Sequence, residues 1–212
     1  MAPYNGLYFY PPRTESKIPY QDSAVMRMWR GYSDSIAQYK LNGNRNVIKV
    51  SPDRRVEFWN RHAEMQKYEI PTPIRDNILA ISPVGHWTVW DTELLHTKTK
   101  NVKNVVYVFD CLVWESKHLA GKTYGERYNI CQERLNGRFF PFTKVESGVY
   151  LAENINVADW DDAWATAKKY DFVEGLVLKR TGAASILTYG GTKVNNSGFM
   201  CRCRKYGKNL MF

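Results

Sequence analysis

The sequence predicts an α+β domain built on a twisted, largely antiparallel sheet. Four segments between residues 46 and 114 are rich in Val, Trp, Tyr and Phe, and Pro, Gly, Asp or Asn separate them, as is typical of strands. Three other segments repeat apolar residues at the spacing of one helix face. This mixture predicts strands and helices packed as layers around one core.

The first half of the chain begins with an irregular lead-in over residues 1–22, which are rich in Pro and Tyr. A short amphipathic helix is expected in SAVMRMWRGY, where Val25, Met28, Trp29 and Tyr32 follow the i, i+3, i+4, i+7 pattern. Strands are expected in NVIKV, VEFWN, HWTVWDTELL and NVVYVFDCLVW.

The second half predicts two further helices and two further strands. TYGERYNICQERL places Tyr124, Tyr128, Cys131 and Leu135 on one stripe. VADWDDAWATAKKY has acidic residues in its first turn, where the helix dipole favours them, and we interpret its tryptophans as core. GLVLKR and GFMCRCRKY predict strands. Without a repeat or an evident linker, residues 1–212 are expected to form a single domain.

Composition narrows the class of protein. Hydrophobic residues make up 44% of the chain and aromatic residues 14%, too many for a disordered protein. Nothing resembles a signal peptide, and no apolar run approaches the roughly 18 residues that span a bilayer. We therefore expect a soluble cytoplasmic protein with no membrane partner. The four cysteines lack zinc-ligand spacing and are expected to be free thiols.

The net charge of +9 favours a polyanionic partner such as nucleic acid, a nucleotide or an anionic membrane. A generally basic surface is the alternative. Positive charge is concentrated at the end of the chain. Residues 193–212 contain no acidic residue and five basic ones: Lys193, Arg202, Arg204, Lys205 and Lys208.

The stretch QYKLNGNRNVIKV contains a candidate nucleophile, Lys40. A lysine with its ordinary pKa of about 10.4 is a poor nucleophile, but burial or nearby cations expose its lone pair. Gly43 allows a tight turn beneath the lysine, and Arg45 lies close enough to contact the same ligand. Taken alone, the fragment is weak evidence for a functional lysine, because Lys-x-Asn-Gly is common in ordinary turns.

Five further segments follow in order: FWNRH (58–62), WDTELL (90–95), YVFDCL (107–112), VEGLVLKR (173–180) and MCRCRKY (200–206). Together with Lys40, this series resembles the nucleotidyltransferase motifs of ATP-dependent DNA and RNA ligases, a superfamily shared with mRNA capping enzymes. The resemblance covers residues 36 to 206, and the sequence is most similar to small phage and bacterial proteins that consist of this domain alone. It implies an ATP-grasp-like nucleotidyltransferase domain, with twisted antiparallel sheets flanked by helices.

The resemblance also implies a chemistry. Lys40 would attack the α-phosphate of ATP to give lysyl-AMP and pyrophosphate. The AMP would then pass to a 5′-phosphate end, and a 3′-hydroxyl would displace it to seal the strand. ATP and Mg²⁺ or Mn²⁺ are the implied cofactors. Because each step is a displacement at phosphorus, positioning and charge neutralisation should dominate catalysis.

Roles follow for the other matched residues. Glu174 would bind the metal, since a hard carboxylate suits Mg²⁺ bridged to phosphates. Glu93 would contact ribose or metal, and Phe109 would stack on adenine. Arg45 and Arg61 would contact ribose or phosphate.

The remaining matched residues are cationic or belong to the turn. Lys179, Arg202 and Arg204 would surround the α-phosphate and disfavour a charged Lys40. The turn residues Asn42 and Gly43 would complete the AMP site. The basic tail would contact nucleic acid through Lys193, Lys205 and Lys208.

Each role has an alternative. Glu93 and Glu174 could be solvated strand residues, and Phe109 could belong to the core. Arg202 and Arg204 alternate with cysteines, so both point to one face of a strand. A phosphate pocket would supply the anions that two arginines need there, and a solvent-facing strand would also suffice.

The chain departs from the family pattern in four places. Asn42 stands where Asp is usual, Thr92 where Gly is usual, and Arg202 and Arg204 where lysines are usual. The fourth departure is the end at KYGKNLMF, where ligases usually continue into an OB-fold domain. We expect no OB-fold domain here, and its role would pass to residues 1–35 with the basic tail, or to an accessory protein.

The leading interpretation is a minimal ATP-dependent DNA ligase that acts as a monomer on nicked duplex nucleic acid, in a bacterial cell or a phage-infected host. EGLVLK with FDCL favours DNA, whereas the relaxed position of Asn42 favours an RNA ligase. A capping guanylyltransferase is a more distant alternative. The alternative outside the enzymes is a binding protein with a ligase-like fold, which holds nucleotide or nicked nucleic acid without catalysis.

Overall fold

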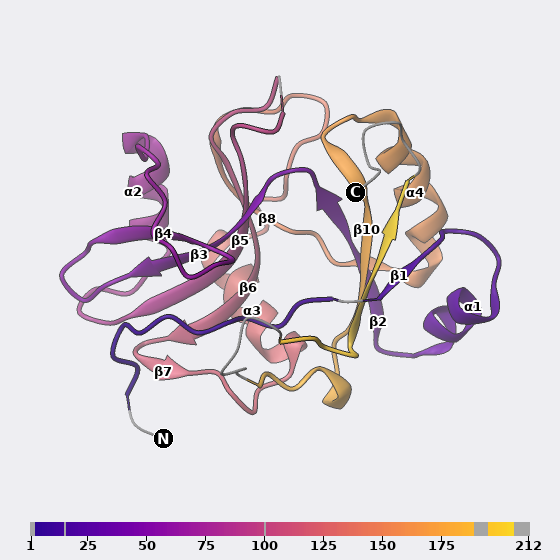
Figure 1. The fold of residues 1–212 in the computed structure, drawn as a ribbon, viewed down its shortest axis with the longest axis horizontal. Helices are drawn as coiled ribbons and strands as arrows, with labels where there is room; N and C mark the ends of the chain where they lie inside the picture. The colour runs from indigo at the N-terminus through magenta and orange to yellow at the C-terminus, as the bar shows by residue number, and fades with distance from the viewer. Residues whose placement is uncertain (1–2, 15, 100, 189–194, 206–212) are drawn as a thin grey trace.

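The structure, a computed structural model, describes residues 3–14, 16–99, 101–188 and 195–205. Its strands form two sheets that lie side by side (Figure 1). The six-stranded sheet has the order β4 (Val56–Asn60), β3 (Asn44–Val50), β5 (Thr88–Leu95), β6 (Val105–Trp114) and β7 (Lys117–His118), with β8 (Gly148–Leu151) parallel to β6. The five-stranded sheet has the order β1 (Lys17–Ile18), β11 (Met200–Arg204), β10 (Val173–Arg180), β2 (Ser35–Leu41) and β9 (Ile155–Asn156).

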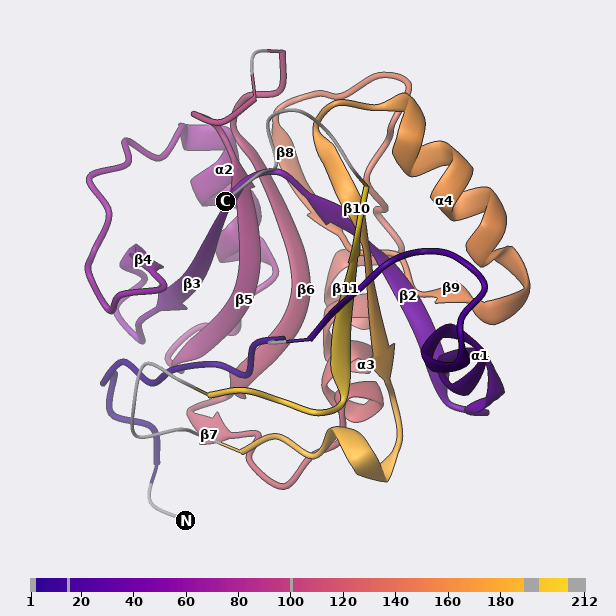
Figure 2. The ribbon, with the colours of Figure 1, turned by 45° about the vertical axis from the view of Figure 1, so that its right-hand side comes forward.

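The two sheets are joined directly between β2 and β3. β2 ends at Leu41 in one sheet and β3 begins at Asn44 in the other, so only Asn42 and Gly43 cross between them. Figure 2 shows β2 and β3 diverging from this junction. Lys40 therefore lies near the end of β2 in one sheet, and Arg45 lies near the start of β3 in the other.

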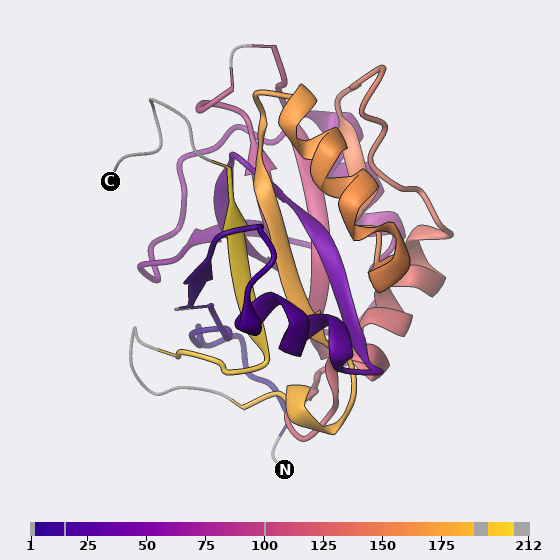
Figure 3. The same ribbon diagram turned by 90° about the vertical axis from the view of Figure 1, so that its right-hand side faces the viewer.

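Helices cover the outer faces of the sheets. α1 (Ala24–Gly31) and α4 (Trp160–Lys169) pack on the five-stranded sheet, on its side away from β3 (Figure 3). α2 (Thr72–Ala80) and α3 (Tyr124–Leu135) contribute to the core of the six-stranded sheet through Ile74, Ile78 and Tyr128. Two 3₁₀ turns complete the described elements, η1 (Val157–Asp159) and η2 (Ala183–Ser185). None of the helices described is long and apolar enough to cross a bilayer.

Local sequence explains where the helices begin. The Ser23 hydroxyl accepts a hydrogen bond from the Met26 amide and caps α1. Thr123 and Glu126 form a reciprocal capping box at the start of α3. In α1 the buried residues are Met26 and Trp29, and Tyr32 after the helix packs against the same core. Val25 and Met28 are exposed, so the predicted apolar stripe is right for Trp29 and Tyr32 and wrong for the other two residues.

The predicted α+β class and the antiparallel sheets are confirmed, and each predicted strand and helix is present. The elements that were not predicted from the sequence are α2 and the strands β1, β2, β7, β8 and β9. Much of the lead-in is irregular, apart from the short β1. The four cysteines are free and buried, as expected.

A buried ion pair fastens α3 to β6. The Arg127 guanidinium, fully buried, donates to both Asp110 oxygens at 2.8 and 2.7 Å. It also donates to the carbonyls of Lys122 and Ser185 at 2.8 and 3.2 Å. With these contacts, the guanidinium is well satisfied away from water. Asp110 follows Phe109 directly, so this pair also fixes the strand that carries the predicted aromatic contact.

We expect Arg127→Met to lower the free energy of unfolding by about 3–5 kcal/mol, because it leaves the Asp110 carboxylate buried and unpaired. Urea denaturation measures the change. Arg75→Met, which removes an exposed ion pair with Asp76, is the control and should cost less than about 1 kcal/mol. Adding Asp110→Leu to Arg127→Met should restore part of the loss. Equal small effects for both single variants would contradict the assignment.

Candidate active site

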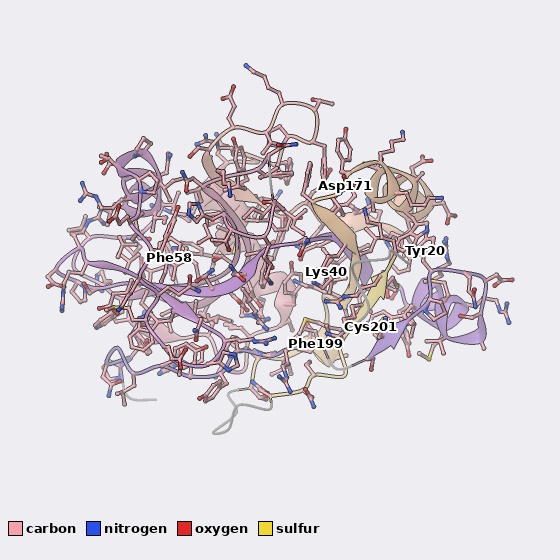
Figure 4. All side chains as sticks on the ribbon, turned by 45° about the horizontal axis from the view of Figure 1, so that its top comes forward. Tyr20, Lys40, Phe58, Asp171, Phe199 and Cys201 are labelled. Carbon is pink, nitrogen blue, oxygen red and sulfur yellow. The ribbon has the colours of Figure 1, made fainter. Side chains whose placement is uncertain are left out.

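A cleft of about 840 Å³ is lined by residues of both sheets, and Lys40 is one of them. Figure 4 labels Lys40 in the region between the two sheets. Its lining has a strong excess of positive charge. The carboxylates that line it are Glu93 and Glu174, and the cations are Arg13, Lys40, Arg45, Arg61, Lys98, Lys179, Arg202 and Arg204. Phe109 supplies an aromatic face. This lining favours a ligand with several negative charges and an aromatic group.

Glu174 holds two of these cations together. Its Oε2 atom lies 2.6 Å from Lys40 Nζ and 2.9 Å from an Arg204 guanidinium nitrogen. The strand register explains the meeting, because Gly175 pairs with Lys40 on β2 and with Arg204 on β11. The three side chains therefore come from three neighbouring strands at one level of the sheet.

Gly175 is required for this arrangement. Its φ of +143° is unfavourable for other residues, and a Cβ atom there would lie 2.0 Å from the Cys203 carbonyl oxygen. The pairing of β10 with β2 shifts register between Val173 and Gly175, on either side of Glu174. The glycine after Glu174 thus allows an irregularity in β10 at the position of the acidic side chain.

Gly43 and Glu93 fix the crossing between the sheets. The Gly43 amide donates to Glu93 Oε1 at 3.0 Å, and the Gly43 carbonyl accepts from Lys98 Nζ at 2.7 Å. A Cβ atom on Gly43 would lie 2.6 Å from the Leu94 carbonyl oxygen, so close approach rather than an unusual φ requires the glycine. Burial raises the pKa of Glu93, the positive charge of Lys40 opposes this shift, and Glu174 adds to it.

Arg45 is already paired within the protein. It donates from Nε to Asp91 Oδ1 at 2.8 Å, donates from its terminal nitrogen to Asp91 Oδ2, and reaches the Pro12 carbonyl at 2.7 Å. Its guanidinium carbon lies 5.7 Å from the centre of the Phe109 ring. The sequence analysis did not single out Asp91. The available signal was its place two residues before Glu93, on the same face of β5.

Lys179 is buried beside aromatic rings. Its Nζ atom lies 5.0 Å from the Phe109 ring centre and 4.3 Å from that of Tyr124, and the residue is 4% exposed. Burial lowers the pKa of Lys179 to about 8, although Asp110 and Asp91 oppose the shift. Lys179 is therefore a cation that the fold holds at some cost in a place where an anionic ligand would stabilise it.

The alternation in β11 works as predicted. Cys201 and Cys203 are buried in the core, while Arg202 and Arg204 line the cleft. The Nε atoms of both arginines are buried and lack a hydrogen-bond partner among the described residues. Buried donors without acceptors are costly, so these two atoms fit an anionic ligand in the cleft.

The other predicted site residues are less central. Arg61 is exposed at the cleft rim, where its Nε contacts His62 Nε2 at 3.2 Å. Asn42 does not line the cleft, and its amide donates to the Phe172 carbonyl at 2.8 Å. Lys205 donates to the carbonyls of Ala167 and Tyr170 near the end of α4, and burial lowers its pKa. Lys193 and Lys208 lie outside the described residues. Their predicted roles stay predictions.

The residues fit a nucleotide, and the carboxylates fit a metal ion that comes with it. Within the described ranges no group of three or more His, Cys, Asp or Glu side chains could hold a metal. Glu93 and Glu174 are two carboxylates facing one cleft. Mg²⁺ is typically held by one or two carboxylates together with substrate phosphates. The donor set therefore suits a phosphate-bound Mg²⁺ better than a resident structural metal.

The two sheets, the crossing between them and the cleft have the fold of solved DNA ligase domains. Solved structures with this fold include the ligase domain of LigD from M. tuberculosis, at a TM-score of 0.60 and 17% identity over 91% of this chain and 58% of that chain. A mycobacterial DNA ligase D complexed with ATP and MES matches at a TM-score of 0.57 and 16% identity, over 91% of this chain and 60% of that chain. A structure from a study of Lig E DNA ligases matches at a TM-score of 0.54 and 12% identity, over 94% of this chain and 70% of that chain.

No family model matches the sequence, and no curated protein does. The chain spans about three-fifths of the length of the two LigD structures. At these identities the likeness concerns the fold, and it confirms at that level the ligase resemblance that the motifs predicted.

We expect Lys179→Met to raise the free energy of unfolding at pH 7, by at most about 3 kcal/mol for a pKa moved from 10.5 to about 8. Below pH 8 the wild-type ammonium is charged in both states, and its burial cost is fully present. Between about pH 8 and 10.5 only the unfolded state keeps the proton, so wild-type stability rises with pH.

The advantage of the variant should therefore shrink from pH 7 to pH 10 in urea titrations. Lys144→Met, at an exposed lysine, is the control and should show no such trend. A difference that stays constant across this range would contradict a charged, buried Lys179.

Proposed function

We propose that this chain is the catalytic domain of an ATP-dependent polynucleotide ligase, which seals 5′-phosphate/3′-hydroxyl nicks through lysyl-AMP on Lys40. The observation that carries the proposal is the position of the Lys40 amine. It shares the Glu174 carboxylate with Arg204 at the centre of a cationic cleft, beside an aromatic face. Such an amine is placed to meet a phosphate that the surrounding cations have neutralised.

In the first step, the adenine stacks on Phe109 and the α-phosphate lies among Lys40, Arg204 and Lys179. Lys40 must leave Glu174 and lose its proton, because only the neutral amine has a lone pair for attack. The new N–P bond forms as the bond from the α-phosphorus to pyrophosphate breaks. Glu93 and Glu174 are the carboxylates that would hold Mg²⁺, whose charge offsets that of the triphosphate.

In the second step, an oxygen of the 5′-phosphate attacks the adenylate phosphorus and the N–P bond to Lys40 breaks. The released amine takes a proton and can pair with Glu174 again. In the third step, the 3′-hydroxyl attacks the 5′-phosphorus, its proton is lost, and AMP leaves. Arg202 and Arg204 remain beside the reacting phosphates and offset their charge throughout.

The fold likeness to DNA ligase domains supports DNA as the strand that this chain seals. An RNA ligase with the same mechanism is the alternative within the class, and Asn42 in place of Asp motivates it. We further propose that the protein acts in the cytoplasm as a monomer on a nicked duplex, with residues 1–35 and the basic tail, or an accessory protein, helping to bind the duplex.

A non-catalytic nucleotide-binding protein is the second candidate. The ion pair between Lys40 and Glu174 motivates it, because a nucleophile held as a salt bridge also suits a purely structural role. The two candidates differ in covalent chemistry. A binder retains nucleotide only while folded, whereas lysyl-AMP survives denaturation.

We expect wild-type protein incubated with α-labelled ATP and Mg²⁺ to carry a label that survives denaturing electrophoresis. Lys40→Ala should carry less than about a hundredth of it, because covalent catalysis depends on the nucleophile. Lys144→Ala, which removes a lysine far along the chain and paired only with Glu146, should label like wild type.

Absence of label in the wild type, with pyrophosphatase present, would sink the ligase proposal unless mass spectrometry finds AMP already attached. Labelled protein would next be given nicked DNA, nicked RNA and mixed duplexes. Sealing confined to RNA strands would contradict the preference for DNA.

A further inference from the structure

The N-terminal belt, defined as residues 3–14 and 16–18, runs from the six-stranded sheet to the five-stranded sheet (Figure 2), and its residues 8 and 10–14 line the cleft. On the six-stranded side, Lys49 Nζ donates to the Gly6 carbonyl at 2.9 Å and the Tyr8 hydroxyl to the Asn60 carbonyl at 3.1 Å. On the other side, the Arg202 amide donates to the Ser16 carbonyl at 3.1 Å. The belt is therefore a fixed wall of the cleft.

Arg13 is the arginine that the belt contributes to the cleft lining. Its backbone is held on both sides, since its amide donates to the Asn195 carbonyl and its carbonyl accepts from the Ser197 amide, both at 2.9 Å. Its Nε donates to Asn196 Oδ1 at 3.1 Å, which orients the guanidinium. It forms no ion pair with any carboxylate described in the structure.

Arg202 lies near Arg13 and is also without a carboxylate among the described ion pairs. Burial lowers the pKa of the Arg202 guanidinium, the positive charges of Arg204 and Arg13 lower it further, and the negative charge of Glu174 only partly opposes this shift. Its Nε atom is buried and has no acceptor within the part of the chain described. Two neighbouring guanidiniums that repel each other, one of them with a buried free donor, are stabilised by an anion that bridges them.

This pair is separate from the cations around Lys40. Arg204 lies at the level of Gly175 and Lys40, whereas Arg202 pairs with Val177. Two residues along a strand correspond to about 7 Å. Arg204 also shares Glu174 with Lys40, whereas neither Arg202 nor Arg13 forms an ion pair with a carboxylate among the described residues.

We propose that Arg13 and Arg202 form a second phosphate subsite, which binds the β- and γ-phosphates of ATP and then the pyrophosphate that leaves. The ligand chemistry is a phosphate group with several negative charges. We favour the nucleotide over the 5′-phosphate of a polynucleotide as its source, because the subsite lies in the same cleft as Phe109 and Lys40. The proposal rests on the proposed function, which places AMP at Lys40.

The test compares ATP with AMP, because the two ligands differ only in the phosphates that this subsite would bind. Affinities are measured by calorimetry in the Lys40→Ala background, which cannot form lysyl-AMP. Adding Arg13→Ala should weaken ATP binding about tenfold, the usual effect of losing a hydrogen bond to a charged group, and leave AMP binding unchanged. Arg13→Lys should restore part of the loss.

Two controls separate charge from structure. Asn196→Ala removes a contact that holds the Arg13 side chain but keeps its charge, and Arg27→Ala removes an exposed arginine paired with Asp22 on α1. Both should retain most of the preference for ATP. An equal loss of ATP and AMP binding in Arg13→Ala would show that the belt only shapes the cleft, and would overturn the proposal.

A further arm uses the sealing of a nick that already carries 5′-AMP, which needs no ATP. If Arg13→Ala slows this reaction and leaves the ATP and AMP affinities unchanged, the subsite belongs to the polynucleotide and the assignment to pyrophosphate is wrong. If the ratio of ATP to AMP affinity depends on Arg13 but the wild type never forms lysyl-AMP, the subsite stands and the proposed function fails.

Discussion

The crossing at Asn42 and Gly43 is the constraint on which the cleft depends. Only these two residues join β2 to β3, so Lys40 and Arg45 lie in different sheets and line the same cleft. The crossing is held by the Phe172 carbonyl, by Glu93 and by the close approach of Gly43 to Leu94. Because the backbone on both sides is fixed within a sheet, the side chains beside the crossing are positioned before any ligand enters.

The cleft also shows how the protein divides its positive charges. Some cations are neutralised internally, as Arg45 is by Asp91 and Lys40 is by Glu174. Others, such as Lys179 and Arg202, lie in surroundings that lower their pKa values. A fold selected for stability alone would not keep the buried Lys179 and the partly buried Arg202, since removing either cation from water destabilises the folded state until an anion arrives. The mixture favours a site prepared for phosphates.

Much of this site could be predicted from the sequence because its residues lie in short motifs. The order of the motifs brought Lys40, Phe109, Glu174 and the two β11 arginines together, and the alternation of cysteine with arginine identified the correct face. The partners could not be found in the same way. Asp91 and Arg13 meet the site through contacts between distant segments, for which a single sequence carries no periodic signal.

Short or proline-containing segments, whose sequence patterns are ambiguous, were also predicted wrongly or not at all. In α1, Trp29 belongs both to the predicted stripe and to the observed buried pair with Met26, so an eight-residue helix could not decide between them. α2 begins between Pro71 and Pro73, where the prolines suggest a loop, although Pro is well tolerated in the first turn of a helix. Lys205 belongs to a basic cluster in the sequence but serves as a donor to carbonyls near the end of α4.

The Glu174 carboxylate couples the release of Lys40 and Arg204 to the entry of a phosphate. Its Oε2 atom contacts both Lys40 and Arg204, so whatever draws one cation away weakens the hold on the other. A phosphate entering the cleft competes for both at once, because it offers them an alternative anion at the same level of the sheet. Under the proposed function, Lys40 would therefore be released mainly when a phosphate is present to be attacked. Without a ligand, the same ion pairs keep Lys40 and Arg204 from repelling each other in a cleft that already holds an excess of positive charge.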